Sequence, residues 1–328
     1  MTRLRVAILG PGGIAARHAR AVAVLGDEME LIAACGRDPG RTAAFTAEHG
    51  GVPFTDPDAM FDSVQPDLLI AALPPHVRDG AIEQAAARGI HLLVEKPIAL
   101  DVDTGRSLVT AAETAGVTAA CGFMYRFGDA VAAWRGANTG VAHMMTATYH
   151  CNALHAPWWR TRALSGGQLL EQAIHLIDLV RLFMGEPDTV TAHAANRAHR
   201  DTPGYDSEDV SAVIFGWDDG RVATLAASNV AVPGRWQKGW SLYAERASAA
   251  FTGWNDAVIT RTAGEIADET VAGPTDVFVA QLADVAAAIR DRRPPAVTLA
   301  EGQATLELAL ATRRAADERR ILRRGDDY

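Results

Sequence analysis

A glycine-rich turn near the start of the chain constrains its fold more than any other stretch. The apolar run from Val6 to Leu9 is typical of a buried parallel strand, and an alanine-rich helical pattern follows the turn. Gly10, Gly12 and Ala15 match the spacing G-x-G-x-x-G/A that binds the pyrophosphate of a dinucleotide. Small residues at these positions permit a tight turn and a close approach of backbone to phosphate. The helix N-terminus then offers free N–H groups to the anion.

Five further strand-like runs follow, and helical patterns separate most of them. The runs cover residues 31–35, 52–54, 67–73, 91–94 and 118–121. Strands that alternate with helices predict a doubly wound parallel sheet, which binds ligands at the carboxyl ends of its strands. We therefore predict an α/β dinucleotide-binding Rossmann domain over residues 1–122. Its predicted cofactor contacts include Gly10, Gly12, Gly13, Ile14, Leu73, Pro74 and His76.

The end of the second predicted strand bears on which nicotinamide cofactor fits. An Asp or Glu there would bind the ribose 2′-hydroxyl of NAD, but the chain has Cys35-Gly36-Arg37-Asp38. Gly36 leaves room, and the guanidinium groups of Arg37 and Arg41 suit a 2′-phosphate, which favours NADP over NAD. Two alternatives stay open. Asp38 caps the next helix while Arg37 is solvated, or Asp38 turns to the ribose and restores NAD.

The composition argues against several classes of protein. The chain has 328 residues, 48% hydrophobic and 22% charged, which is ordinary for a globular protein of two domains. A net charge of −9, with the C-terminal arginines interleaved with acidic residues, argues against a nucleic-acid partner. No run suits a membrane span or a secretory leader, and the three cysteines lack the spacing of a metal site. We expect a cytoplasmic protein with no metal and no membrane partner.

Glu95-Lys96-Pro97 follows the fifth predicted strand, on the ligand-binding edge of the sheet. A lysine ammonium there can donate to a substrate oxygen and stabilise negative charge that develops on it. Glu95 can hold the lysine in place, and we include both residues among the cofactor contacts. The alternative for Lys96 is a solvated surface group.

After residue 122 the alternation stops, and we predict an α+β domain over residues 123–328. One amphipathic helix ends at Gly185, and in it Glu171, His175 and Asp178 recur at i, i+4 and i+7, so they share a face. Polar groups on an apolar helix need partners or a cleft. We interpret this stripe as a site, with Asp178 as a structural partner.

Strand-like runs from residue 190 to residue 262 predict a large, mostly antiparallel sheet with one open face. Asp218-Asp219-Gly220 is typical of a hairpin turn, and two helical patterns close the chain. The candidate substrate contacts are Arg126, Trp158 and Arg160. A tryptophan can stack on a sugar and an arginine can bind a carboxylate or phosphate. Packing of the predicted loop that carries Trp158 and Arg160 against the sheet is an equal alternative.

Four features together resemble the glucose–fructose oxidoreductase, inositol dehydrogenase and rhizopine-catabolism family, Gfo/Idh/MocA. They are the fingerprint turn, Pro74-Pro75, Glu95-Lys96-Pro97 and Gly122-Phe123. The resemblance covers residues 4–126 and resumes over 166–187. It implies that Lys96 is catalytic, that His175 is a general acid and base, and that the open sheet face forms a homo-oligomer, either dimer or tetramer. The chain departs from the family at Glu171, where an Asp is usual, and at Arg78, where a His is common.

The implied activity is reversible hydride transfer between a nicotinamide cofactor and a secondary alcohol of a sugar, cyclitol or related cyclic hydroxy compound. His175 would take the hydroxyl proton, Lys96 would polarise the oxygen, and Glu171 would orient the substrate or tune His175. The hypothesis requires Lys96 and His175 to meet at one reactive carbon. Alternatives are a dihydrodiol dehydrogenase or ketosugar reductase of the same fold, and a cofactor-binding sensor without turnover.

Overall fold

The computed structural model describes residues 3–152, 157–230, 235–264 and 266–328. The chain divides into two units, each built from two stretches of sequence. The first unit comprises Met1–Met124 and Asp276–Gln303, and the second comprises Tyr125–Thr275 and Ala304–Tyr328.

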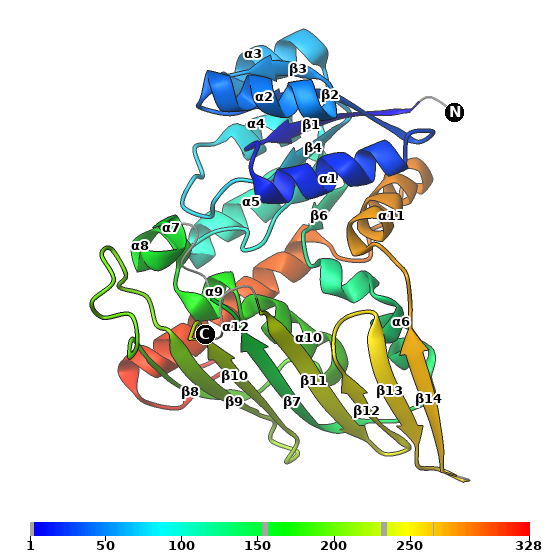
Figure 1. The fold of residues 1–328 in the computed structure, drawn as a ribbon, viewed down its shortest axis with the longest axis vertical. Helices are drawn as coiled ribbons and strands as arrows, with labels where there is room; N and C mark the ends of the chain where they lie inside the picture. Colours follow the sequence, from blue (N-terminus) through cyan, green and yellow to red (C-terminus); the bar gives the residue numbers. More distant parts are fainter. Residues whose placement is uncertain (1–2, 153–156, 231–234, 265) are drawn as a thin grey trace. The chain divides into compact units, whose positions relative to one another are not determined.

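Within the described ranges, the first unit contains a parallel six-stranded sheet with the order β3-β2-β1-β4-β5-β6 (Figure 1). Its strands are β1 (Leu4–Leu9), β2 (Met29–Cys35), β3 (Val52–Phe54), β4 (Leu68–Ala71), β5 (His91–Val94) and β6 (Ala119–Cys121). The apolar run of β1 is buried from Val6 to Leu9, as expected for a parallel strand covered on both faces. The predicted doubly wound sheet is confirmed.

Short polar residues fix where several helices of the first unit begin. Its helices are α1 (Gly13–Val24), α2 (Pro39–His49), α3 (Pro57–Val64), α4 (Ala81–Ala87), α5 (Val102–Ala115) and α11 (Val277–Asp291). Asp38, Asp56 and Asp101 each accept a backbone N–H at the N-terminus of α2, α3 and α5. Such caps satisfy donors that the first helical turn leaves unpaired.

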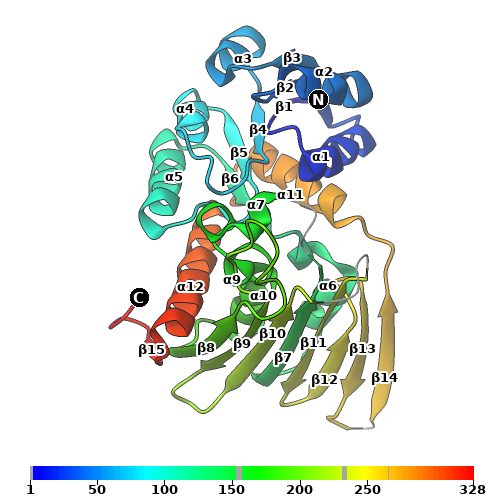
Figure 2. The same ribbon diagram turned by 60° about the vertical axis from the view of Figure 1, so that its left-hand side comes forward.

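Helix α11 belongs to the first unit although it follows the second in sequence. It lies beside α1 (Figures 1 and 2), and the Phe278 ring meets the His18 ring edge-on, with centroids 5.2 Å apart. The Gln281 side chain donates to the Cys121 carbonyl oxygen at 3.1 Å. The predicted second domain, residues 123–328, includes α11, whereas in the structure α11 packs on α1 and is bonded to the end of β6.

The second unit contains a nine-stranded sheet, counted over the described residues, with the order β14-β13-β12-β11-β7-β10-β9-β8-β15. Its strands are β7 (Ala142–His150), β8 (Thr189–Ala195), β9 (Val210–Gly216), β10 (Val222–Ser228), β11 (Gln237–Ala244), β12 (Ala247–Phe251), β13 (Asp256–Arg261), β14 (Ala267–Ala272) and β15 (Leu322–Arg323). The pair β7–β10 is parallel, and the other pairs are antiparallel. The predicted hairpin joins β9 to β10, with Gly220 at φ +91°.

Helices cover one face of this sheet and leave the other open. The helices of the second unit are η1 (Met124–Phe127), α6 (Asp129–Gly136), α7 (Pro157–Arg160), α8 (Arg162–Ser165), α9 (Gln168–Glu171), α10 (Ile174–Met184) and most of α12 (Leu299–Glu318). The first residue of η1, Met124, is the last residue of the first stretch of the first unit. Figures 1 and 2 show α9, α10 and α12 on the same face. The predicted α+β architecture with an open-faced sheet is confirmed.

The helix expected to run without interruption to Gly185 is broken into α9 and α10. The backbone N–H groups of Gln172 and Ala173 both donate to the Gln168 carbonyl oxygen, each at 3.0 Å. The bond from Ala173 spans five residues and widens the turn, a local geometry often found at functional sites. Glu171 therefore ends α9, whereas His175 and Asp178 belong to α10.

Candidate functional site

One candidate site is the carboxyl edge of the parallel sheet in the first unit. Leu9 pairs with Cys35 and with Ala71, Ala71 pairs with Val94, and Val94 pairs with Cys121. Five strands thus end level with one another. The residues that follow them, which include the glycine-rich turn and Lys96, are therefore brought to one edge.

The glycine-rich turn leaves the open backbone that a dinucleotide needs. Gly10 has φ +89°, and a Cβ added there would lie 2.8 Å from the Ala72 carbonyl oxygen, so a glycine is required. Gly12 precedes α1 without a side-chain cap, and a Cβ on Gly13 would meet nothing within 4 Å. Among the described residues, the first turn of α1 carries no acidic side chain. This glycine cradle at an uncapped helix N-terminus fits a pyrophosphate.

At the end of β2, the Asp38 side chain acts as a helix cap. Its carboxylate accepts the Arg41 backbone N–H at 3.0 Å and caps α2. A Cβ on Gly36 would lie 2.6 Å from the Pro11 Cδ atom, so this position also requires a glycine. The side chains of Arg37 and Arg41 are exposed next to it.

Arg78 joins the loops that follow β4 and β5, a role that the sequence analysis did not assign to it. Its guanidinium donates to the carbonyl oxygens of Pro74 at 3.1 Å, Pro97 at 3.1 Å and Ile98 at 2.6 Å. Burial lowers the pKa of Arg78 to about 10. The loop carrying Pro74 and His76 is thus held against the segment just after Lys96. The only sequence signal was that Arg78 stands where the family usually has a His.

Glu95 is anchored inside the first unit and positions the backbone of Lys96. Its Oε1 atom lies 2.7 Å from His18 Nε2, and its Oε2 atom accepts the Lys96 backbone N–H at 3.1 Å. Gly122 makes room for this carboxylate, because a Cβ there would lie 2.7 Å from Glu95 Oε2. Glu95 thus acts on the Lys96 backbone and on α1. His18 is not among the predicted site residues, and its only sequence signal is that it is a polar residue on the buried side of α1.

A second candidate site surrounds His175, which is buried in the second unit together with Glu171. The Tyr125 ring stacks on the His175 imidazole with centroids 4.4 Å apart and planes 12° apart. Trp254 lies against Tyr125 in turn, at 4.6 Å. Burial raises the pKa of Tyr125, so its phenol stays protonated. The orientation of the imidazole is therefore set by an aromatic neighbour that the sequence analysis did not select.

An aromatic wall extends from Tyr125 across the sheet. We use this name for Tyr125, Tyr149, Trp159, Trp236 and Trp254. Trp236 lies 6.2 Å from the Tyr149 ring and 6.4 Å from the Trp159 ring, measured between centroids. Trp158 packs edge-on against Trp159 at 5.6 Å. Helix α7, which carries both tryptophans, therefore packs against Trp236 through Trp159. The predicted substrate contact Trp158 lies at the end of the wall.

The predicted substrate contact Arg126 is bound to Asp178. Its guanidinium donates twice to the carboxylate, at 2.8 and 2.6 Å, and the side chains are 7% and 1% exposed. The Thr305 hydroxyl donates to the same carboxylate at 3.1 Å. Asp178 is thus a structural partner, and Arg126 has a structural role as well. For Arg160, the carbonyl oxygen accepts two backbone N–H groups, from Asp206 and Ser207.

A buried polar network supports the turn between α9 and α10. The Cys151 Sγ atom lies 3.0 Å from Asn229 Oδ1 and 3.3 Å from Gln172 Oε1, so the two oxygens share its one S–H donor. Burial raises the pKa of Cys151 to about 12, so the thiol stays protonated and can donate. The network explains Gln172, whose amide links the turn to the end of β7.

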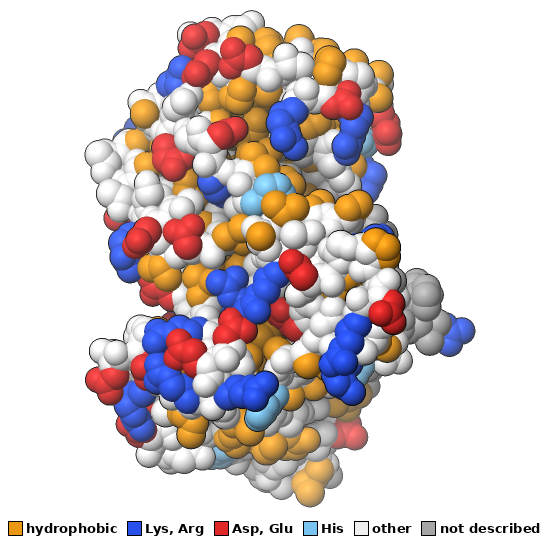
Figure 3. Space-filling view, turned by 90° about the vertical axis from the view of Figure 1, so that its left-hand side faces the viewer, with side chains coloured by type: hydrophobic (Ala, Val, Ile, Leu, Met, Phe, Trp, Pro, Cys, Tyr) orange, Lys and Arg blue, Asp and Glu red, His pale blue; other side chains and the backbone are white. Residues whose placement is uncertain are grey.

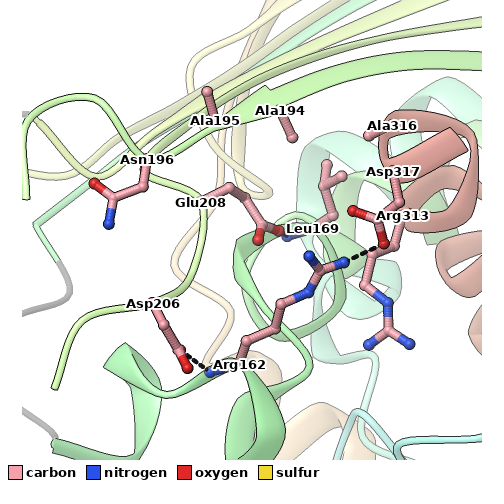
Figure 4. Close-up of a pocket in the computed structure, with 10 residues that line it drawn as sticks. All are labelled: Arg162, Leu169, Ala194, Ala195, Asn196, Asp206, Glu208, Arg313, Ala316 and Asp317. Carbon is pink, nitrogen blue, oxygen red and sulfur yellow. Dashed lines mark hydrogen bonds and ion pairs between the residues drawn. The ribbon is translucent and has the colours of Figure 1, made fainter. Parts of the chain in front are cut away.

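A small cavity of about 100 Å³ lies in the second unit, close to α8 (Figure 4). Arg162 donates to Asp317 through its guanidinium and to Asp206 through its backbone N–H, each at 2.5 Å. Arg313 donates to the Gly166 carbonyl oxygen, and Glu208 accepts the Leu169 N–H. Because these charged side chains bond to one another or to the backbone, they stabilise the segment that leads from α8 into α9.

The described ranges contain no group of three His, Cys, Asp or Glu side chains arranged to hold a metal ion. In the same part of the chain, none of the helices combines the length and apolar character that a membrane crossing requires.

The fold and the glycine cradle define a two-unit protein with a dinucleotide-binding Rossmann unit. The model of the oxidoreductase family with an NAD-binding Rossmann fold, Gfo/Idh/MocA, matches residues 4–123, and that of the Gfo/Idh/MocA C-terminal domain matches residues 102–250. The chain belongs to the Gfo/Idh/MocA family.

Individual relatives agree with this assignment. Inositol 2-dehydrogenase of Rhizobium meliloti is 30% identical over 70% of each chain. A 2,7-anhydro-N-acetylneuraminate hydratase of Escherichia coli is 30% identical over 58% of this chain, which spans only about half, 53%, of that relative. Levoglucosan dehydrogenase in complex with NADH and levoglucosan superimposes with a TM-score of 0.90 at 18% identity, covering 99% of this chain and 100% of that one. At that identity the likeness shows the fold.

We predict that Gly122→Ala destabilises the first unit. The new methyl group would overlap the buried Glu95 carboxylate, and overpacking of this kind costs about 1–3 kcal/mol. The measurement is the free energy of unfolding from denaturant titration. Gly136→Ala is the matched control, because a Cβ at that helical position meets nothing within 4 Å. Equal stability of the two variants would contradict the packing described for Glu95.

Proposed function

We propose that the protein is an NAD(P)-dependent dehydrogenase or reductase acting on a secondary alcohol or ketone of a sugar, cyclitol or related cyclic hydroxy compound. The observation that carries the proposal is the level edge of the parallel sheet, which presents the glycine cradle and Lys96 together. The stacked, buried His175 and the aromatic wall support the same function, because aromatic faces suit the apolar faces of sugar rings.

In the proposed mechanism each residue has one task. His175 takes the hydroxyl proton when the alcohol is oxidised and returns it on reduction. Lys96 donates to the same oxygen and stabilises its negative charge. Glu171 orients the substrate or tunes His175, while Tyr125 holds the imidazole plane. When bound, the nicotinamide coenzyme supplies the hydride acceptor or donor.

For the coenzyme, we propose that NADP is preferred over NAD. Support comes from Asp38, whose carboxylate is engaged as a helix cap. Arg37 and Arg41 are exposed beside Gly36 and carry the charge that a 2′-phosphate requires.

We also propose that the protein is a homo-oligomer, a dimer or tetramer formed through the open sheet face. Met144, Ile214, Tyr243 and Val258 are 38–49% exposed there, on four strands. Apolar surface of this kind marks protein interfaces.

We predict that light scattering gives a particle mass that is a multiple of the 34.8 kDa chain mass. The substitution Ile214→Asp should lower that particle mass. A wild-type monomer would contradict the proposal.

The proposed partners are otherwise small molecules, and the proposed location is the cytoplasm. Figure 3 shows Lys and Arg side chains next to Asp and Glu over the displayed face, which suits this choice better than a nucleic acid. The three cysteines are free and buried, which is compatible with a reducing compartment.

We predict that Lys96→Met and His175→Asn each lower kcat by at least about 100-fold, the usual contribution of such groups. Coenzyme affinity, measured by fluorescence titration, should stay within about threefold, because the proposed mechanism uses the charge of Lys96 and the proton transfer of His175 on the substrate oxygen. The assay follows nicotinamide absorbance with a panel of sugars and cyclitols. If both variants keep wild-type kcat, the mechanism is wrong. If the wild type binds coenzyme but never turns over, the sensor alternative is favoured.

We predict that Arg37→Ser lowers the ratio of kcat/KM for NADP to that for NAD by about 10–100-fold, the loss of a charge-assisted contact to phosphate. Arg3→Ser is the control, because Arg3 precedes the opposite end of β1. An unchanged ratio would remove Arg37 from coenzyme selection.

A further inference from the structure

Lys238 occupies an unusual position beside the candidate site. It lies on β11, where it pairs with Tyr149 of β7. Its ammonium nitrogen is 4.9 Å from the Trp236 ring centroid, 5.0 Å from Tyr149 and 5.5 Å from each of Tyr125 and Trp254. All four distances lie within the range of cation–π attraction. We call these four rings, of Tyr125, Tyr149, Trp236 and Trp254, the cage. The side chain of Lys238 is only half-buried, so the cage holds the ammonium in place while part of the side chain stays exposed.

The sheet geometry directs this ammonium toward His175. Side chains two residues apart on a strand share a face, and Trp240, two residues after Lys238, is buried on the helix-covered side. Tyr125 links the groups directly, because its ring contacts both the Lys238 ammonium and the His175 imidazole. Lys238 therefore belongs to the site and not to the open face of the sheet.

The composition makes the choice of residue notable. Of the 31 Lys and Arg residues in the chain, 29 are arginines and two are lysines, Lys96 and Lys238. A compact ammonium fits between several rings, whereas a planar guanidinium stacks on one. The cage also fixes a side chain whose conformational freedom is otherwise costly to lose. Such a preorganised charge is ready to bind a ligand.

The charges around His175 indicate which ligand that is. Lys238 and Glu171 carry opposite charges, and both act on the Cys151 thiol, whose pKa Lys238 lowers and Glu171 raises. Tyr125, Tyr149 and Cys151 are neutral because burial raises the pKa of each, and Arg126 and Asp178 neutralise each other. When His175 accepts a proton, the group therefore carries a net positive charge. A negative group on the substrate would balance it.

We propose that Lys238 binds an anionic substituent, a carboxylate or a phosphate, on the cyclic substrate, while the aromatic wall contacts the apolar face of the ring. This inference rests on the proposed function and narrows its substrate class to acidic or phosphorylated sugars and cyclitols. Lys238 is thus a specificity-determining residue.

Kinetics on matched substrates test the assignment. Glucose, glucuronate and glucose 6-phosphate share a ring and differ in charge. Lys238→Met keeps the apolar stem in the cage and removes the charge, and Lys238→Arg keeps the charge. We expect Lys238→Met to lower kcat/KM about 10–100-fold for the anionic substrate, as for a lost charge-assisted bond, and less than about twofold for glucose. Loss confined to glucuronate identifies a carboxylate, and loss confined to glucose 6-phosphate identifies a phosphate. Equal loss on all three, or no loss on any, overturns the proposal.

A binding measurement keeps the test independent of turnover and of variant folding. With two lysines, protein labelled with ¹³C-lysine gives two Cε–Hε signals, which Lys238→Met assigns. We expect glucuronate or glucose 6-phosphate, added with NADPH, to shift the Lys238 signal, and glucose to leave it in place. A shift without hydride transfer to or from any substrate would refute the proposed function and keep the anion site. Turnover without a shift of the Lys238 signal for either anion would refute the anion site and keep the proposed function.

Discussion

The register of the parallel sheet is the constraint on which the coenzyme half of the molecule depends. Because Leu9, Ala71 and Val94 end their strands level with one another, loops of unrelated sequence are brought to a single edge. Burial of the strands fixes this register, since their side chains are covered on both faces. What remains is to hold the loops themselves, and the half-buried Arg78 and the buried Glu95 do so. Arg78 donates to four carbonyl oxygens, and Glu95 binds His18 and the Lys96 backbone.

The second unit meets a different physical problem, because its polar site residues lie in a largely apolar pair of helices. Asp178 is satisfied by Arg126 and Thr305. Cys151 bonds to Gln172, and thereby supports the wide turn that separates Glu171 from His175. Satisfied groups of this kind cost little to bury, whereas unsatisfied ones are expensive. The imidazole is oriented by ring stacking, so its plane depends on apolar packing as well as on polar bonds.

Much of this architecture could be predicted from local sequence patterns. The apolar strand before Gly10 and the hairpin turn at Gly220 could be predicted because the residue types in these short segments favour the structures they form. The break after Glu171 was not foreseeable, because Gln172 and Ala173 are compatible with a continuous helix and only tertiary bonds separate the two segments. Likewise, Tyr125 and Lys238 are 113 positions apart, and no periodic pattern connects them. The roles of Glu95 and Arg126 also depended on distant partners, His18 and Asp178.

Helix α11 has a consequence for how the chain can be divided. The polypeptide leaves the coenzyme unit after Met124, builds the large sheet, and returns at Asp276 to lie against α1 before continuing into α12. The N-terminal half expressed alone would lack the helix that covers His18 and the bond that Gln281 makes to the end of β6. The first unit is therefore complete only after the sheet unit has been synthesised, and no single cut of the chain separates the two units.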